Sequence, residues 1–249
     1  MKQVIIMGSG PGVLRAQGWD KRAGQVLVAI NNAWQVRPDW DWLIHPEDFP
    51  ADRWPSALMP GQAVVTAADY VPVQNDFGGF VYAGGTMAFT AAYWALGALR
   101  PDVIAMIGCD MVYPATGRTH FYGTGEADPL RDDVTLRSLE AKSARLMVQA
   151  AELGCAVVNL SEARDSRLVY PRATREGLAA FRAWQFDPVC IAAARLAETE
   201  AAYSVPSGRY WTEAERFDPT VIDRIDALWL QAAQTPANAG RWAQGQGSL

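Results

Sequence analysis

The two histidines of the chain, His45 and His120, are the side chains best suited to proton transfer near neutral pH. His120 lies in a polar stretch, directly after Arg118 and Thr119 and before two aromatic residues. A histidine in such a loop suits proton transfer or contact with a phosphate, and the Arg118 guanidinium can pair bidentately with one. His45 ends an apolar run and is equally suited to a hydrogen bond at a strand end. We therefore predict a catalytic role for His120 and binding roles for Arg118 and His45.

A glycine-rich segment, Gly8-Ser9-Gly10-Pro11-Gly12, follows the first apolar run of the chain. Glycine lets a backbone approach a ligand closely, and Pro11 fits the first turn of a helix. The backbone amides of such a turn can face an anion. The spacing is not that of the dinucleotide fingerprint, and the lysine of a P-loop is missing. The segment predicts Gly8, Ser9 and Gly10 as one wall of a nucleotide site, with a tight packing turn as the alternative.

Two further groups stand where predicted elements meet. Gly84, Gly85 and Thr86 precede a predicted helix, where Thr86 is either an N-cap or a phosphate ligand. Asn31 ends an apolar run, and its amide offers both a donor and an acceptor to a base or ribose. The alternative for Asn31 is a turn residue with positive φ. We include all four residues among the candidate binding residues.

Asp110 is the last candidate and follows the apolar run 103–107. A carboxylate at the end of a strand can orient a ribose hydroxyl, take a proton or hold Mg²⁺. It can also cap a loop. We count Asp110 among the candidate catalytic residues, and the spacing of the cysteines and histidines predicts no metal site.

The elements that must position these residues are short apolar runs alternating with helical segments. We predict strands at 4–7, 25–30, 40–44, 63–66, 80–82, 103–107 and 156–159, and helices at 86–99 and 136–153. This alternation indicates an α/β, Rossmann-like, doubly wound and mainly parallel sheet. Ligands bind at the carboxyl ends of strands in such sheets, where the candidate residues cluster.

The chain changes character near residue 174. We predict a nucleotide-binding domain over 1–173, a helical C-terminal extension over 174–235 and a flexible tail over 236–249. The helical stretches of the extension are expected at 175–184, 188–203 and 219–234. The extension suits a lid, a cover for the sheet or a surface for a homo-oligomer.

Composition excludes several classes of function. The chain has 249 residues and a net charge of −5, with 22 basic and 27 acidic residues, which argues against nucleic acid as a partner. No apolar stretch approaches the ~20 residues of a membrane span, and the first apolar run is too short for a signal peptide. Three widely spaced cysteines in apolar surroundings are typical of a reduced, cytoplasmic protein. We expect a cytoplasmic protein whose partner is a small-molecule nucleotide.

Four of these segments, in this order along the chain, resemble the bacterial CMP-sialic-acid-dependent sialyltransferases of the lipooligosaccharide type. They are residues 2–11, 30–32, 83–86 and 107–113. The resemblance implies that the Ser9-Gly10 loop, Asn31 and the 84–86 segment contact the cytidine nucleotide. It implies that Tyr113 holds the phosphate leaving group, and His45 falls where the family has a donor-contacting asparagine. Residues 108–120 also resemble a Rossmann-like family that includes a 6-hydroxymethyl-dihydropterin pyrophosphokinase.

Three functions follow as hypotheses. The preferred one is a nucleotide-dependent transferase, a glycosyltransferase whose substrate is a CMP-linked nucleotide sugar. The sequence firmly implies no cofactor for it. The first alternative is a diphosphokinase that acts on a pterin-like heterocycle, with Mg²⁺ held by Asp110. The second alternative is a non-catalytic binding protein on the same fold. It stays open because the family places its catalytic histidine downstream of the tyrosines, whereas no histidine follows His120 here.

Overall fold

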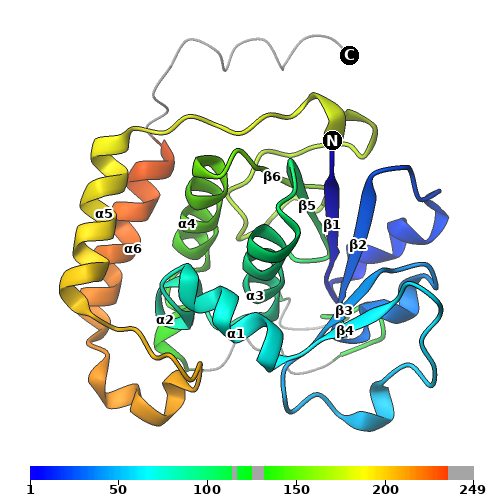
Figure 1. The fold of residues 1–249 in the computed structure, drawn as a ribbon, viewed down its shortest axis with the longest axis horizontal. Helices are drawn as coiled ribbons and strands as arrows, with labels where there is room; N and C mark the ends of the chain where they lie inside the picture. The colour runs from blue at the N-terminus through cyan, green and yellow to red at the C-terminus, as the bar shows by residue number, and fades with distance from the viewer. Residues whose placement is uncertain (114–116, 125–131, 235–249) are drawn as a thin grey trace.

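The apolar runs of the sequence form one six-stranded sheet in the computed structural model, which describes residues 1–113, 117–124 and 132–234. All neighbouring strands pair in parallel, in the order β4-β3-β2-β1-β5-β6 (Figure 1). The predicted α/β, Rossmann-like fold with a helical C-terminal region is confirmed. The strands are β1 (Gln3–Met7), β2 (Gln25–Ile30), β3 (Trp42–Ile44), β4 (Ala63–Val65), β5 (Val103–Ile107) and β6 (Ala156–Asn159).

The order of the strands reverses direction at β1. From β1 the chain adds β2, β3 and β4 on one side, and it then crosses to add β5 and β6 on the other side. The loops that leave β1 and β5 therefore diverge to opposite sides and open a crevice between them. This topological switch point is where the sequence carries residues 8–12 and 108–110.

Helices cover the sheet, and the structure also contains shorter helical turns. The α-helices are α1 (Ala67–Asp76), α2 (Phe80–Ala83), α3 (Met87–Trp94), α4 (Leu139–Glu152), α5 (Pro188–Ala201) and α6 (Pro219–Gln234). The 3-10 helices are Pro11–Gly18, Asn31–Val36, Ala51–Arg53, Val134–Leu136, Glu176–Ala180 and Tyr210–Arg216, and a π-helical turn spans Ala95–Leu99.

The two faces of the sheet bury separate hydrophobic clusters. Along β1, Val4 and Ile6 contribute to the cluster under the α-helices, whereas Ile5 and Met7 contribute to the cluster on the other face. The second cluster is covered by the 3-10 helices that follow β1 and β2. Because both faces are covered, the strands are continuous apolar runs rather than alternating ones.

Two predicted elements are wrong. The run 80–82 is not a strand but the short helix α2, and residues 175–184 contain only the 3-10 helix Glu176–Ala180. All three residues of the run 80–82 are buried and apolar. A run this short shows no hydrophobic period that could distinguish a strand from a helix. Gly78 and Gly79, both with positive φ, then turn the chain into α2.

The helical extension packs on the body of the protein and covers α4. Figure 1 shows α5 and α6 side by side, with α6 next to α4. Two buried ion pairs fasten them: Arg145 Nε to Glu198 Oε1 at 2.6 Å, and Lys142 Nζ to Asp226 Oδ1 at 2.7 Å. Such pairs fix the position at which the helices pack, because separating the partners would leave an unpaired charge buried in the protein. The predicted tail, 236–249, lies outside the described residues.

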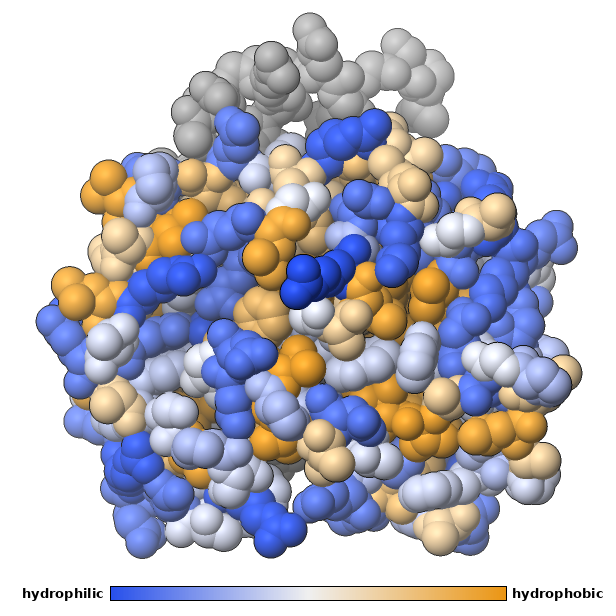
Figure 2. All heavy atoms as spheres, in the orientation of Figure 1, coloured by the Kyte–Doolittle hydropathy of each residue, from blue (hydrophilic) through white to orange (hydrophobic). Residues whose placement is uncertain are grey.

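The outer surface of the helical layer mixes polar and apolar side chains. Figure 2 shows hydrophilic and hydrophobic residues interspersed over the face that carries α1, α3 and α4. In the described part of the chain, no helix combines the length and the apolar character that crossing a bilayer requires.

Candidate functional site

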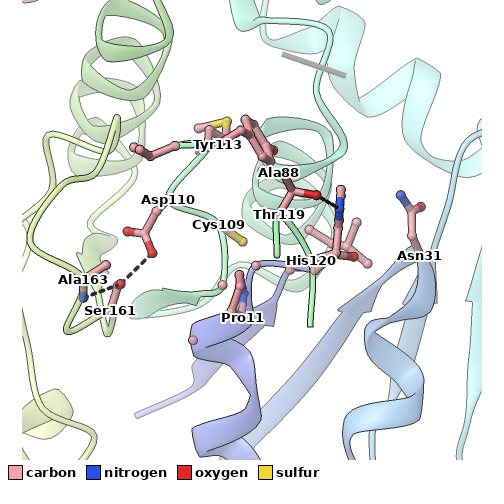
Figure 3. A pocket seen from close by; sticks show the side chains of 18 of the residues that line it. Pro11, Asn31, Ala88, Cys109, Asp110, Tyr113, Thr119, His120, Ser161 and Ala163 are labelled. Carbon is pink, nitrogen blue, oxygen red and sulfur yellow. Dashed lines mark hydrogen bonds between the residues drawn. The ribbon is translucent and has the colours of Figure 1, made fainter. Parts of the chain in front are cut away.

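A cleft of about 540 Å³ opens at the carboxyl ends of β1 and β5. Its volume falls within the range of small-molecule sites. We call it the switch-point cleft, and Figure 3 shows it from close by. Its lining comes mainly from the loops that follow four strands. These are residues 8–12 and 15 after β1, residues 30–32 after β2, residues 108–113, 119, 120 and 122 after β5, and residues 161–165 after β6, with further contributions from Phe49, Arg53 and residues 86–88.

Eight of the twelve predicted site residues line this cleft. They come from segments that lie far apart in the sequence, and sequence order alone does not require them to meet. The eight residues are Gly8, Ser9, Gly10, Asn31, Thr86, Asp110, Tyr113 and His120.

The glycine loop after β1 is built by close packing against the loop after β5. A Cβ at Gly8 would collide with the carbonyl oxygen of Gly108 and lie 2.6 Å from Cys109 Sγ. A Cβ at Gly10 would lie 2.8 Å from the same carbonyl oxygen. Gly108 itself has φ +68°, a conformation that side chains rarely adopt. The packing turn proposed as an alternative for residues 8–12 is therefore present, inside the wall of the cleft.

The amides of the glycine loop divide into two groups. Gly8 N donates to Ile107 O and Gly10 N to Gly108 O, each at 2.8 Å, so these two groups are used inside the protein. Pro11 has no amide hydrogen. Among the hydrogen bonds of the described residues, the amides of Ser9 and Gly12 have no acceptor. An anion in the switch-point cleft would therefore meet the donors of Ser9 and Gly12 rather than a full ring of loop amides.

His120 is held beside this loop by its backbone neighbours and by aromatic rings. The amide of Phe121 donates to Ser9 O at 2.9 Å, which ties the histidine loop to the glycine loop. The His120 ring stacks on Tyr122 with centroids 5.0 Å apart and lies 6.1 Å from the Tyr113 ring. A hydrogen bond of 2.8 Å joins His120 Nδ1 to Thr119 Oγ1 (Figure 3). The imidazole is only 9% exposed, so its position is well defined.

Asp110 lies on the side of the cleft opposite His120 and Asn31 (Figure 3). Its carboxylate accepts hydrogen bonds from Ser161 Oγ at 2.5 Å and from Asn159 Nδ2 at 3.2 Å. Arg172 lies 3.9 Å away. Both carboxylate oxygens thus fasten the segment after β6, which makes Asp110 a positioning residue for that wall.

The neighbouring thiol does not serve as a nucleophile in this arrangement. Cys109 lines the cleft but is only 4% exposed. Burial raises the pKa of the Cys109 thiol far above its ordinary value, and the negative charge of Asp110 adds to the effect. A cysteine acts as a nucleophile as the thiolate, which this environment disfavours.

Asn31 and Thr86 each have a local structural role and also border the cleft. Asn31 has φ +51°, so it is the turn residue that the strand end requires, and it also lines the switch-point cleft. Its Oδ1 is buried and has no partner among the described residues. Thr86 is the N-cap of α3, because its hydroxyl accepts the amide of Phe89 at 3.3 Å. The cap occupies the Thr86 side chain, although the residue borders the cleft.

Four predicted residues lie elsewhere. A Cβ at Gly84 would press on Phe89 and Lys142, so this glycine serves helix packing, and Gly85 faces a second cavity. His45 is buried between Phe49 and Trp54, and its Nδ1 lies 2.9 Å from the carbonyl oxygen of Pro46. Arg118 is exposed and does not line the cleft.

Three arginines in the lining were missed in the sequence. Arg15 pairs with Glu162 and donates to Leu160 O at 3.1 Å. Arg53 and Arg164 are exposed, and neither forms an ion pair with another described residue. An exposed arginine in a loop has no pattern of its own in a sequence, and only the fold brings these two to one cleft.

Among the described residues, no three His, Cys, Asp or Glu side chains are grouped so that they could hold a metal ion. Comparison with protein-family models, with curated proteins and with solved structures finds no match to this chain. The function is therefore argued from the geometry of the site.

Proposed function

We propose that the protein is a nucleotide-dependent transferase, most like a glycosyltransferase, that binds the nucleotide of its donor in the switch-point cleft. The observation that carries the proposal is the convergence of Ser9, Asn31, Tyr113 and His120 on one cleft at the switch point of a Rossmann-like sheet. Rossmann-like sheets bind nucleotides at this position. The fold supports nucleotide binding, and the transferase chemistry rests on the site residues.

The phosphate of the donor would be held where the cleft offers donors and positive charge. The amides of Ser9 and Gly12 stand at the start of the 3-10 helix Pro11–Gly18. Arg53 and Arg164 line the same cleft without a carboxylate partner among the described residues. An arginine can grip a phosphate with two parallel hydrogen bonds. The charge that develops on the leaving phosphate would thus be stabilised by groups already in place.

His120 would act on the proton or the charge of the transfer step. Its imidazole is held between Tyr113 and Tyr122 and is tied to Thr119. We assign it the role of the base that takes the proton of the acceptor hydroxyl. Tyr113 would hold the leaving phosphate.

The likeness of residues 2–11, 30–32, 83–86 and 107–113 to the bacterial sialyltransferases suggests a CMP-linked sugar as the donor. We also propose that the enzyme is cytoplasmic, because its three cysteines are free thiols set in apolar surroundings. The alternative with Mg²⁺ at Asp110 finds less support, since both oxygens of that carboxylate already accept hydrogen bonds from Ser161 and Asn159.

The test is isothermal titration of the full chain with CMP, CDP, UDP and ATP, each with and without Mg²⁺. We expect CMP to bind best and without a requirement for Mg²⁺. Absence of binding by all four at millimolar concentration would contradict the proposal. An ATP complex that is strengthened by Mg²⁺ and lost in Asp110→Ala would replace it with the diphosphokinase.

A charge-removing variant sharpens the test. Arg164→Ala should weaken CMP about tenfold or more, because a hydrogen bond between charged groups contributes about 1.5–3 kcal/mol. The matched control is Arg224→Ala, on the exposed side of α6 and outside the cleft lining. An equal loss in both variants would show a general charge effect and would remove Arg164 from the proposed site.

A further inference from the structure

A second cavity, of about 650 Å³, lies next to the switch-point cleft. We call it the aromatic cavity. It lies between the loop after β3, the helices α1 and α2, and the loop that joins α5 to α6. The last of these contributes residues 207–211, so the helical extension supplies one wall of the cavity.

The rings of the aromatic cavity are arranged as a connected set. Phe80 lies 6.3 Å from Tyr210 in a stacked arrangement and 6.3 Å from Tyr70 in an edge arrangement. Trp211 packs edge-on against Tyr210 and is 58% exposed. Rigid aromatic faces with a few polar groups at their edges are typical of small-molecule sites.

The charges of the aromatic cavity are mainly negative. Glu47, Asp48 and Asp133 contribute three carboxylates, and Arg209 contributes one guanidinium. Asp133 accepts the Tyr210 hydroxyl at 2.8 Å, and Arg209 lies 3.5 Å from Glu47. Asp48 has no hydrogen-bond or ion-pair partner among the described residues and is available to a ligand.

The pKa of the Tyr70 phenol is affected by the same negative charges. Burial raises the pKa of Tyr70 to about 12, and the negative charges of Glu47 and Asp48 add to the effect. This is the direction expected for a buried neutral phenol whose deprotonation would place a negative charge beside two existing carboxylates.

The two cavities meet at three residues. Asn31, Phe49 and Met87 line both the switch-point cleft and the aromatic cavity. A ligand in one cavity therefore shares a boundary with a ligand in the other. The unpartnered Oδ1 of Asn31 lies at this boundary.

We propose that the aromatic cavity is the acceptor site and that it takes a hydroxyl-rich sugar ring without a negative charge. This inference rests on the proposed function. The face of a sugar ring can pack on Trp211, the largely exposed ring of the set, whereas Phe80 and Tyr210 line the cavity as buried rings. The exposed carboxylates of Glu47 and Asp48 can accept hydrogen bonds from sugar hydroxyls. A sugar acid would place its carboxylate beside these groups, and the repulsion between like charges disfavours its binding.

Each bond made or broken in the transfer step is then accounted for, with His120 as the group that takes the proton. The acceptor hydroxyl oxygen forms a bond to the anomeric carbon of the donor sugar. The bond from that carbon to the phosphate oxygen breaks, and the nucleoside monophosphate leaves with the electron pair. The hydroxyl proton goes to His120, which lines the switch-point cleft on the same side as Asn31, opposite Asp110 (Figure 3).

The experiment measures binding of three probes to the full chain: methyl β-galactoside, methyl β-glucosaminide and N-acetylneuraminic acid. Each is titrated by ligand-observed NMR in the presence of CMP. We expect the first two to bind and the sugar acid not to bind. Binding of the sugar acid alone, or of none of the three, overturns the inference.

Variants place the probes in the cavity. Asp48→Asn should lower the affinity for the glycosides about fivefold or more. Trp211→Ala should lower it by a similar factor and should still fold, because the Trp211 ring is largely exposed. CMP affinity should change less than twofold in both variants. The matched control Glu200→Gln lies on the exposed face of α5 and should change neither affinity. An equal loss of glycoside affinity in the control overturns the assignment.

The two proposals fail separately in this design. Binding of CMP without any glycoside leaves the donor site in place and removes the acceptor site. Binding of glycosides without any nucleotide removes the transferase and leaves a sugar-binding cavity. A charge reversal, Asp48→Lys, should admit N-acetylneuraminic acid, and its failure to do so while the glycosides still bind contradicts the role assigned to the negative charge.

Discussion

The switch-point cleft and the aromatic cavity share a boundary but differ in the groups that line them. One wall of the cleft is backbone, formed where the glycine loop after β1 packs on Gly108, and the side chains of Tyr113, His120 and the arginines complete the lining. The aromatic cavity is lined chiefly by the rings and carboxylates of side chains. Backbone walls are set by the pairing of the sheet, whereas side-chain walls depend on loops that the sheet does not fix.

Because of this difference, we expect the two cavities to tolerate amino-acid substitutions unequally. A Cβ added at Gly8 or Gly10 meets main-chain atoms of Gly108, which cannot move without disturbing β1 or β5. A Cβ added at Gly85 in the aromatic cavity meets the side-chain hydroxyls of Tyr210 and Thr135, which can shift with their hydrogen bonds to Asp133 and leave the sheet in place. We therefore expect the same substitution, glycine to alanine, to have unequal effects in the two places.

The largest effect is expected for Gly8→Ala in the cleft. The added Cβ collides with the carbonyl oxygen of Gly108 and lies 2.6 Å from Cys109 Sγ. We expect the free energy of unfolding to fall by about 3 kcal/mol, the upper part of the usual range for overpacking. Urea denaturation measures it.

Gly12→Ala is the matched control in the same loop, because nothing lies within 4 Å of its added Cβ. Its unfolding free energy should change by less than about 0.5 kcal/mol, as for an ordinary surface substitution. Equal losses in Gly8→Ala and Gly12→Ala would show that the loop is not held by close packing.

A smaller effect is expected for Asp110→Ala, which removes the acceptor of Ser161 Oγ and Asn159 Nδ2. We expect a loss of about 2 kcal/mol in unfolding free energy, because hydrogen bonds to a charged group are being removed. The loss should be the same with and without Mg²⁺. A wild-type chain that Mg²⁺ stabilises and a variant that it does not would instead make Asp110 a metal ligand.

A loss of stability smaller than those of Gly8→Ala and Asp110→Ala is expected for Gly85→Ala in the aromatic cavity. The added Cβ meets the Tyr210 hydroxyl and lies 2.8 Å from Thr135 Oγ1. Because both are ends of side chains, we expect a cost of about 1 kcal/mol, together with weaker glycoside binding and unchanged CMP affinity. Thermal unfolding and titration measure the two effects.

The double variant Gly85→Ala with Tyr210→Phe provides the control for this collision. Removing the hydroxyl removes the atom that the new methyl meets, so the two changes should cost less together than the sum of each alone. Additive costs would show that Gly85 and Tyr210 do not interact, and the wall assigned to residues 207–211 would then be wrong.

Much of the sheet could be predicted from the sequence. Residues 25–30 and 103–107 are buried on both faces and bounded by Asn, Gly or Pro, so their period and their ends agree with the strands observed. The helix at residues 80–83 could not be predicted in this way, because a few consecutive buried residues show no hydrophobic period.

The site was predictable in part. Ser9, Asn31 and Asp110 each end a strand, and parallel pairing brings strand ends to one edge. The use of Gly8 depends on Gly108, one hundred positions away, so no local pattern reveals it. Arg53 and Arg164 lie in loops, and Gly84 was assigned to the site although it packs on α4; each depends on contacts between distant segments.

The loop between α5 and α6 bears on how such a protein could evolve. Both flanking helices are anchored on α4 by buried ion pairs, Arg145 with Glu198 and Lys142 with Asp226. The loop between these anchors contributes residues to the aromatic cavity and none to the lining of the switch-point cleft. If the aromatic cavity binds the acceptor as proposed, mutations in residues 207–211 alter which molecule is accepted and leave the sheet and the switch-point cleft unchanged. In a family of descendants, this loop is where divergence in preference would accumulate first.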